Sequence, residues 1–245
     1  MTRHGPHDTP GGPAASPETA AETAAAACRE SLVDDIRHEA RETAFWTGRE
    51  RFAEAVMEAI GRVHRHAFMP DAMPPQLAYA NRPQSIGHGQ TISQPYIVAL
   101  MTDLLDLQGG ERVLEIGAGC GYQSAVLAEL KGEVYAVERL EPLADLARAN
   151  LAKLGYDNVT VRCGDGTKGW AEHAPYDGIL VTACQDGPIP SALVEQLRPG
   201  GRMVIPLGHQ FGPQMLHLGV KAPNGHFTHT PVLPVAFVPL VTGRE

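Results

Sequence analysis

The feature of this sequence that most constrains its fold is the alternation of short apolar runs with amphipathic ones after Arg112. The apolar runs share branched side chains and lie at residues 112–116, 133–138, 158–162 and 177–182. The amphipathic runs share three- and four-residue spacing and lie at residues 122–130, 142–154 and 191–197. A further strand is expected at 202–206, after a Pro-Gly-Gly turn at 199–201. This alternation predicts an α/β fold, a doubly wound and mostly parallel sheet with helices on both faces.

The two flanks of this region follow other patterns. Toward the C-terminus, residues 215–220 and 234–240 lose helical periodicity, so we expect the sheet to end in antiparallel strands. On the N-terminal side, apolar side chains share two helical faces, one with Leu32, Val33, Ile36 and Ala40 and one with Phe52, Val56, Met57, Ile60 and Val63. We therefore expect an N-terminal helical segment over residues 28–90, packed on a core domain over residues 91–245.

The first residues are expected to form a disordered tail. Residues 1–17 contain four prolines and three glycines and almost no large apolar side chain. Such a segment cannot bury enough surface to offset the entropy of ordering the chain. The Ala/Thr/Glu stretch Thr19–Ala27 is interpreted as frayed helix, so the predicted tail covers residues 1–27. A linker peculiar to this chain is expected at Thr43–Arg49.

Composition excludes several classes of protein. The formal net charge is −8, from 20 basic and 28 acidic residues, whereas a nucleic-acid backbone is bound by clustered Lys and Arg. No apolar run approaches the ~20 residues that cross a bilayer. The four cysteines show no CxxC spacing, which argues against a zinc cluster or a disulfide framework. We expect a cytoplasmic protein with reduced thiols and with no metal, nucleic-acid or membrane partner.

A glycine-rich loop occupies the first strand-to-helix turn. Residues 115–121 are Glu-Ile-Gly-Ala-Gly-Cys-Gly, and glycines there let the backbone approach a ligand at the carboxyl edge of the sheet. The spacing is G-x-G-x-G, not the G-x-G-x-x-G of a pyrophosphate-binding turn. The carboxylate of Glu115 would repel a pyrophosphate but attract an ammonium group, directly or through water.

Acidic side chains also follow the next two strands. Glu138 ends the second strand, where a carboxylate can accept both hydroxyls of a ribose. Asp165 follows the third strand, where an acid can bind an exocyclic adenine amine, and Gly166 leaves room for the ring. Ammonium, ribose and adenine without phosphate describe S-adenosylmethionine. The predicted cofactor-binding residues are Glu115, Ile116, Gly117, Ala118, Gly119, Gly121, Glu138, Arg139, Asp165 and Gly166.

These residues resemble those of class I S-adenosylmethionine-dependent methyltransferases, whose fold is Rossmann-like. The run Gly-His-Gly-Gln-Thr-Ile-Ser-Gln-Pro at 87–95, preceded by Tyr79–Pro83, narrows the resemblance to the protein-L-isoaspartate O-methyltransferase family. Further matches lie at 63–70, 164–166, 174–177, 197–202 and 237–240. The resemblance extends from about Cys28 to Leu240. His64, where the family usually has proline, and Cys120 in the glycine loop depart from the family pattern.

The resemblance implies roles for the signature run. Ser93 corresponds to the family's proposed catalytic serine, and together with Thr91 it would orient the substrate carboxylate without forming a covalent bond. Substrate contacts are implied for Gln90, Ile92 and Gln214. Spacing alone favours a different role for Ser93, because Ser-x-Pro is a helix-start signal and the serine would then cap a helix over 94–105. The family signature favours the catalytic role.

The activity that the resemblance implies is methyl transfer from S-adenosylmethionine to the free carboxylate of L-isoaspartyl residues in damaged proteins. Its partners would be isoaspartyl peptides and proteins, and the enzyme would be a monomer. Three alternatives remain: a class I methyltransferase for another carboxylate or small molecule, a nicotinamide-dependent oxidoreductase, and a cofactor-binding protein without activity. The glycine spacing argues against the oxidoreductase, and the signature run argues against the other two.

Overall fold

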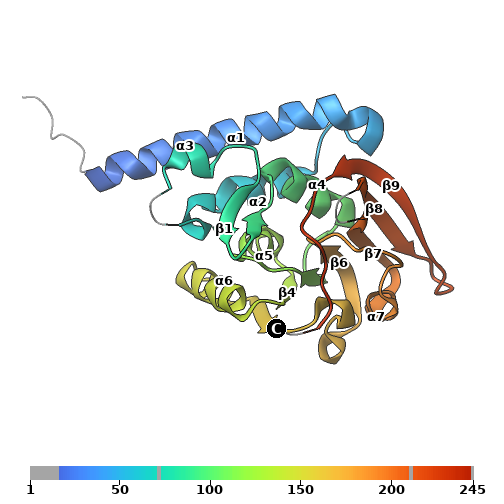
Figure 1. Ribbon diagram of the computed structural model, residues 1–245. Helices are drawn as coiled ribbons and strands as arrows, with labels where there is room; N and C mark the ends of the chain where they lie inside the picture. Colours follow the sequence, from blue (N-terminus) through green and yellow to red (C-terminus); the bar gives the residue numbers. More distant parts are fainter. Residues whose placement is uncertain (1–16, 71–72, 210–211, 244–245) are drawn as a thin grey trace, which may run out of the picture.

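A sheet of seven strands forms the centre of the structure (Figure 1). Its strands are β3 (Arg112–Ile116), β4 (Glu133–Glu138), β5 (Val159–Cys163), β6 (Tyr176–Val181), β7 (Leu197–Gly208), β8 (Gln214–Lys221) and β9 (Phe227–Val235). They lie in the order β5-β4-β3-β6-β7-β8-β9, parallel from β5 to β7 and antiparallel from β7 to β9. The computed structural model describes residues 17–70, 73–209 and 212–243. The predicted doubly wound, mostly parallel sheet with antiparallel C-terminal strands is confirmed.

Helices cover both faces of this sheet. The helices are α1 (Pro17–Thr47), α2 (Glu54–Arg62), α3 (Pro75–Ala78), α4 (Pro95–Leu105), α5 (Tyr122–Ala128), α6 (Glu141–Lys153) and α7 (Ser191–Gln196), with short 3-10 turns at Arg65–Phe68, Gly166–Lys168 and Ala171–His173. Helices α4, α5 and α6 pack on one face and α7 on the other. Successive residues of β3 alternate between these faces, with Val113 in one buried cluster and Leu114 in the other.

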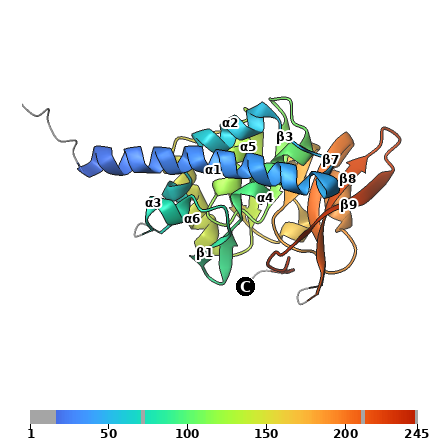
Figure 2. The same ribbon diagram turned by 90° about the horizontal axis from the view of Figure 1, so that it is seen from above.

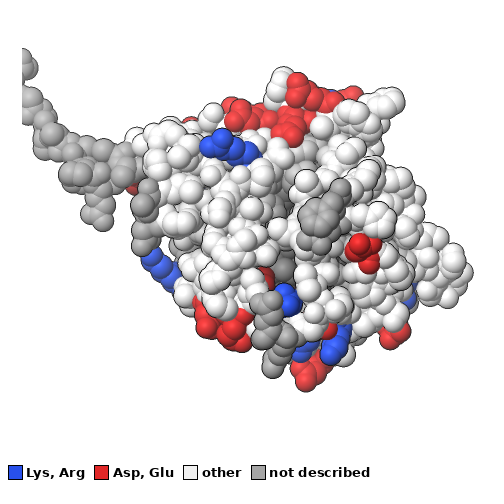
Figure 3. Space-filling model, viewed as in Figure 1, with Lys and Arg blue, Asp and Glu red and all other residues white. Residues whose placement is uncertain are grey.

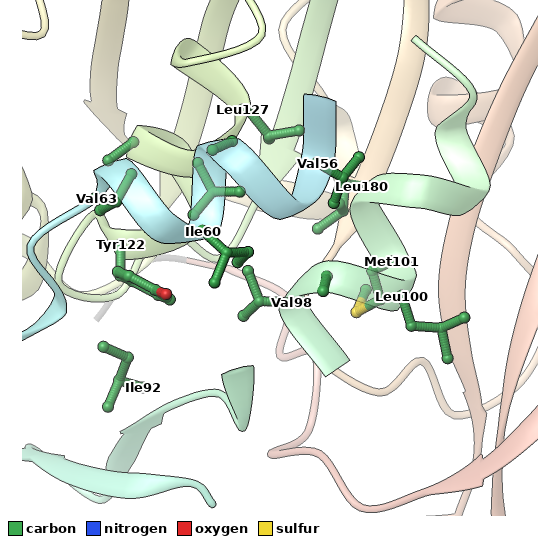
Figure 4. Close-up of a cluster of buried hydrophobic side chains, with 14 of the residues drawn as sticks. Val56, Ile60, Val63, Ile92, Val98, Leu100, Met101, Tyr122, Leu127 and Leu180 are labelled. Carbon is green, nitrogen blue, oxygen red and sulfur yellow. The ribbon is translucent and has the colours of Figure 1, made fainter. Parts of the chain in front are cut away.

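The N-terminal helices share the core of the sheet. In Figure 4, Val56 and Ile60 of α2 point toward Met101 of α4 and Leu127 of α5, and all four belong to one buried cluster. Helix α1 lies across α4 on the outside of this layer (Figure 2). Burying a side chain of this size contributes roughly 1.5–3 kcal/mol to folding, so α2 is fixed firmly on the core.

Helix α1 corrects two expectations. It is a single helix of 31 residues from Pro17 to Thr47, so it includes the stretch Thr19–Ala27 interpreted as frayed helix and begins before the expected boundary at residue 27. The linker expected at Thr43–Arg49 begins only after Thr47. Alanine has the highest helix propensity, and Ala25 is 2% exposed, so the buried face of the helix extends into the alanine-rich stretch. The rest of the predicted tail, residues 1–16, lies outside the described residues.

A hairpin that the sequence patterns did not predict carries the signature run. Strands β1 (Gln84–Gly87) and β2 (Gln90–Ile92) pair antiparallel in a sheet of their own. The turn between them has positive φ angles of 88° at Gly87, 52° at His88 and 69° at Gly89. Glycine adopts such a backbone readily, and two of the three residues are glycine. The boundary expected between residues 90 and 91 therefore falls inside this hairpin.

Strand boundaries near the C-terminus also differ from expectation. Strand β7 begins at Leu197, before the expected turn at 199–201, and its register against β6 shifts there. The strand expected at 234–240 is wrong, because β9 ends at Val235. In the next residues the side chain of Gln214 bonds to the backbone of Phe237: its Oε1 accepts from the N–H of Phe237 at 2.6 Å, and its Nε2 donates to the carbonyl of Phe237 at 3.1 Å. Val238 and Leu240 then bond to the backbone of Cys184 in an isolated parallel bridge.

Acidic side chains gather along the edge of the molecule where α1 runs (Figure 3). The exposed acidic residues of this helix include Glu30, Asp34, Asp35 and Glu42. Within the described part of the chain, no helix is both long enough and apolar enough to cross a membrane.

Candidate functional site

The carboxyl ends of the central strands open into one cleft. Its walls come from the β1–β2 hairpin, the glycine loop after β3, the end of β4 and the C-terminal segment. The predicted site residues that line it are Gln90, Thr91, Ile92, Ser93, Glu115, Ile116, Gly117, Ala118, Gly119, Glu138, Arg139 and Gly166. Parallel strands end at the same edge of a sheet, which is why segments far apart in sequence meet here. Gly121, Asp165 and Gln214 are predicted site residues that do not line this cleft.

Glu115 is a carboxylate at the bottom of the cleft. The side chain is fully buried, and its Oε2 accepts a hydrogen bond from the hydroxyl of Ser124. Among the described residues, its Oε1 has no hydrogen-bond partner. Burial, opposed by the hydrogen bond from Ser124 and aided by the charge of Glu138, raises the pKa of Glu115 to about 8. A buried carboxylate oxygen without a partner, in the wall of a cleft, suits a ligand that brings a positive charge.

Glu138 organises the glycine loop. Its Oε2 accepts the N–H of Gly119 at 2.9 Å, and its Oε1 accepts the N–H of Leu140 at 3.0 Å. The side chain is 7% exposed and lines the cleft. Because each carboxylate oxygen can accept more than one hydrogen bond, Glu138 retains capacity for two ligand hydroxyls.

Two glycines of the loop have different roles. Gly117 has φ 95°, and a Cβ there would lie 2.4 Å from the hydroxyl oxygen of Thr182, which donates to the Gly117 carbonyl at 2.6 Å. No other residue fits at this position without displacing Thr182. Gly121 is the N-cap of α5 with φ 91°, and a Cβ there would lie 3.2 Å from Leu151 of α6. Gly121 therefore serves the packing of α5 on α6 and not the lining of the cleft.

Asp165 connects the loop after β5 to the C-terminal segment. Its Oδ1 accepts from the N–H and the hydroxyl of Thr167 at 3.0 and 2.7 Å, and its Oδ2 accepts from the N–H of Gly243 at 3.1 Å. Partial burial alone would raise the pKa of Asp165, but these hydrogen bonds outweigh it, so that the pKa lies below its ordinary value. Residues 238–241, just before Gly243, line the cleft, so Asp165 holds that segment in place.

A second cleft adjoins the first. Thr91, Ser93, Thr182 and Val238 line both clefts. The remaining walls of the second cleft are mainly apolar and comprise Pro83, Gln94, Ile97, Pro234, Val235, Ala236 and Phe237. Gln214 lies outside this lining and reaches it through its two hydrogen bonds to Phe237.

Ser93 lies at the entrance to α4, but it does not cap the helix. Gln94 occupies the N-cap position, and Pro95 is the first helical residue. The interpretation of Ser93 as a helix cap is therefore wrong. Pro95 has no N–H to leave unsatisfied, and the N–H of the next residue, Tyr96, donates to Oδ1 of Asn81 at 2.9 Å, so these two positions do not depend on a serine cap.

The sequence patterns missed several lining residues. They are Val98, Cys120, Tyr122, Gln123, Val137, Leu140, Thr182, Ala183 and residues 238–241. Thr182 follows the end of β6 at the same sheet edge, which is a signal that could have found it. Cys120 is 2% exposed, and burial raises its pKa to about 11, so the thiol stays protonated and poorly reactive at neutral pH.

The strand order and the glycine-lined cleft at the carboxyl edge define a class I methyltransferase fold. A solved protein-L-isoaspartate O-methyltransferase superimposes with a TM-score of 0.75 at 29% identity, covering 86% of this chain and 65% of its own chain. A Plasmodium falciparum beta-aspartate methyltransferase in complex with S-adenosyl-L-homocysteine has a TM-score of 0.72 at 22% identity, covering 88% of this chain and 99% of its own. The second likeness shows the fold alone.

The family follows from sequence comparison. The family model described as Protein-L-isoaspartate(D-aspartate) O-methyltransferase (PCMT) matches residues 45–245, and the chain belongs to this family. It is 54% identical over 214 residues to protein-L-isoaspartate O-methyltransferase 2 of Polaromonas sp., covering 87% of this chain and 100% of that protein. Protein-L-isoaspartate O-methyltransferase 2 of Syntrophobacter fumaroxidans is 52% identical over 218 residues, covering 89% of this chain and 87% of that protein.

Proposed function

We propose that this chain transfers a methyl group from S-adenosylmethionine to the free carboxylate of L-isoaspartyl residues in damaged peptides and proteins. Membership of the family and the names of its relatives support this proposal. The observation that carries it is the position of Thr91 and Ser93, which line both clefts. A methyl donor in the first cleft and a polypeptide in the second would meet at these two hydroxyls.

The residues of the first cleft fit S-adenosylmethionine. The unpartnered Oε1 of Glu115 would take the ammonium group, and the carboxylate of Glu138 would take the ribose hydroxyls. Gly166 lines the cleft without a side chain, which leaves space for the adenine ring. When bound, S-adenosylmethionine supplies a methyl group on a positively charged sulfur.

The chemistry requires positioning more than acid–base catalysis. A side-chain carboxylate with a pKa near ~4 is ionised at neutral pH, so its oxygen can attack without giving up a proton. The new oxygen–carbon bond forms as the carbon–sulfur bond breaks, and the electron pair leaves with the sulfur. Ser93 and Thr91 would donate hydrogen bonds that hold the carboxylate in line, while the cleft walls exclude water.

The product accounts for repair. The methyl ester carries a better leaving group than the carboxylate does, so the neighbouring backbone nitrogen attacks it and forms a succinimide without further catalysis. Hydrolysis of the succinimide returns part of the material to normal aspartyl. We also propose that the enzyme acts in the cytoplasm, for which the four free cysteines are the supporting observation.

The experiment uses labelled S-adenosylmethionine with an isoaspartyl peptide, its aspartyl counterpart and a set of small free carboxylic acids. We expect label in the isoaspartyl peptide alone. Label in the small acids and none in the peptide would favour the alternative, a methyltransferase for another carboxylate. Cofactor binding without any transfer would favour a protein that has lost activity.

A further inference from the structure

Helix α1 contacts the edge of the candidate site through the carboxylate of Glu39. Glu39 is a half-buried residue of α1 whose Oε2 accepts from Nδ2 of Asn81 at 2.7 Å. Nε2 of Gln94 lies 3.1 Å from each of the two carboxylate oxygens and donates to them. The family model matches from residue 45 onward, so Glu39 lies outside the matched part of the chain.

The two partners of Glu39 stand at the two ends of the signature segment. Residues 82–93 lie between Asn81 and Gln94, and they include the β1–β2 hairpin together with Thr91 and Ser93. One carboxylate bonded to both flanking amides therefore links the two ends of this segment, in addition to the pairing of β1 with β2 and the bond between Asn81 and Tyr96. Closing a loop restricts the positions its residues can adopt, and Ser93 is adjacent to the closing point.

Two further hydrogen bonds hold Asn81 and the first turn of α4 in place. The backbone N–H of Tyr96 donates to Oδ1 of Asn81 at 2.9 Å, which ties Asn81 to the first turn of α4. The hydroxyl of Tyr96 forms a hydrogen bond with the hydroxyl of Thr43, one turn beyond Glu39 on α1. Two successive turns of α1 thus contact the start of α4, immediately after Ser93.

We propose that Glu39 is a positioning residue for methyl transfer, which acts through Asn81 and Gln94 to hold Thr91 and Ser93 in the wall between the two clefts. This inference rests on the proposed function. Without the carboxylate, the ends of residues 82–93 separate more easily and the two hydroxyls sample other positions. A misplacement of about 1 Å in a catalytic group can lower the rate on the order of 10²-fold.

The surroundings of the Glu39 carboxylate allow a positioning role in catalysis to be distinguished from a role in stabilising the fold. Burial raises the pKa of Glu39, and the charges of Glu42 and Asp35 add to this effect, against the hydrogen bonds from Gln94 and Asn81. A carboxylate in such surroundings costs free energy for desolvation. Asn81 and Gln94 are only partly buried, so their amides can bond to water when the carboxylate is removed. Its replacement should therefore lower the melting temperature only modestly, while a positioning role predicts a large change in turnover.

The experiment compares Glu39→Ala and Glu39→Gln with Glu42→Ala as the matched control. Glu42 belongs to the same helix, its side chain is 64% exposed, and it pairs with His38 on α1 itself. For each protein we would measure kcat and KM with an isoaspartyl peptide, Kd for S-adenosylhomocysteine, melting temperature and hydrogen exchange of residues 82–93.

For Glu39→Ala we expect kcat to fall at least tenfold and the amides of residues 82–93 to exchange hydrogen faster. The Kd for S-adenosylhomocysteine should stay within about threefold of its original value, because Glu115 and Glu138 lie on other elements. Glu39→Gln keeps one acceptor oxygen, so its kcat should be intermediate. Equal turnover in Glu39→Ala and Glu42→Ala, or a loss of turnover without faster exchange at 82–93, would overturn the proposal. If the unaltered protein does not methylate the peptide, the proposed function fails, while hydrogen exchange still decides whether Glu39 closes the segment.

Discussion

The carboxylate of Glu138 accepts the backbone N–H of Gly119 at 2.9 Å, so the end of β4 fixes the shape of the loop that follows β3. The same side chain also accepts the N–H of Leu140 and lines the cleft. A single carboxylate can therefore shape the loop before any ligand arrives and still offer lone pairs to the ligand.

Glu138→Ala should lower both stability and cofactor affinity. Two backbone N–H groups lose their acceptor, and each one left buried without a partner costs about 1–3 kcal/mol. We expect a melting temperature several degrees lower and binding of S-adenosylhomocysteine at least tenfold weaker, as measured by thermal unfolding and calorimetry. Affinity equal to that of the original protein would mean that Glu138 is not a ligand-binding residue.

Binding of S-adenosylhomocysteine should strengthen as pH rises from about 6 to 7.5. The pKa of Glu115 is about 8, so the free protein holds this carboxyl largely protonated over that range, whereas an ammonium group binds its ionised form. Calorimetry at several pH values would show the change, and Glu115→Gln should bind weakly with no such dependence. Affinity that is flat or falls with pH in the original protein would contradict the assignment of Glu115.

The same residue should make the ligand-free protein less stable at high pH. The folded-state pKa of Glu115, about 8, lies above the ordinary value of 4.5, so the folded state binds this proton more tightly than the unfolded state does. Its contribution to stability is complete below pH 4.5 and is lost as pH rises toward 8. Glu115→Gln stays neutral throughout, and its melting temperature should exceed that of the original protein increasingly from pH 5 to 8. A constant difference would show that titration of Glu115 is not the cause.

Ser93→Ala should lower turnover more than cofactor affinity. Ser93 lines both clefts and its hydroxyl would orient the substrate carboxylate, whereas the residues proposed to hold the cofactor lie mainly at the ends of β3 and β4. We expect kcat to fall about tenfold or more, with Kd for S-adenosylhomocysteine nearly unchanged. Equal losses in both quantities, or none, would remove this role from Ser93.

Cys120 should react slowly with alkylating reagents in the folded protein. Its thiol is 2% exposed and its pKa is raised by burial to about 11, while Cys28 and Cys163 are only partly buried. Timed alkylation followed by peptide mass spectrometry should find Cys120 modified after these two. Modification of Cys120 first would show that the glycine loop opens more than the structure indicates.

The sequence was most informative where local pattern and burial agree. Strands β3 and β4 have the predicted bounds, and most of their residues are apolar and buried, as in a strand that is covered on both faces. The cleft proposed to bind the cofactor follows from these strands, since Glu115 and Glu138 lie at the strand ends. The signature run gave Thr91 and Ser93 through family resemblance and not through periodicity.

What the sequence did not predict depends on long-range contacts. The C-terminal segment after Val235 has a strand-like composition, yet the backbone groups of Phe237 bond to the side chain of Gln214, and those of Val238 and Leu240 bond to the backbone of Cys184. The closure of residues 82–93 by Glu39 joins groups more than forty positions apart, and no local pattern indicates it. Contacts of this kind become visible only when the elements are placed in space.

The most direct test of the central claim uses one peptide that carries both an isoaspartyl and an aspartyl residue. The peptide is incubated with the protein and S-adenosylmethionine, and the methylated position is located by fragmentation mass spectrometry. We predict a methyl ester at the isoaspartyl residue and none at the aspartyl residue. Esters at both residues, or at the aspartyl residue alone, would contradict the account.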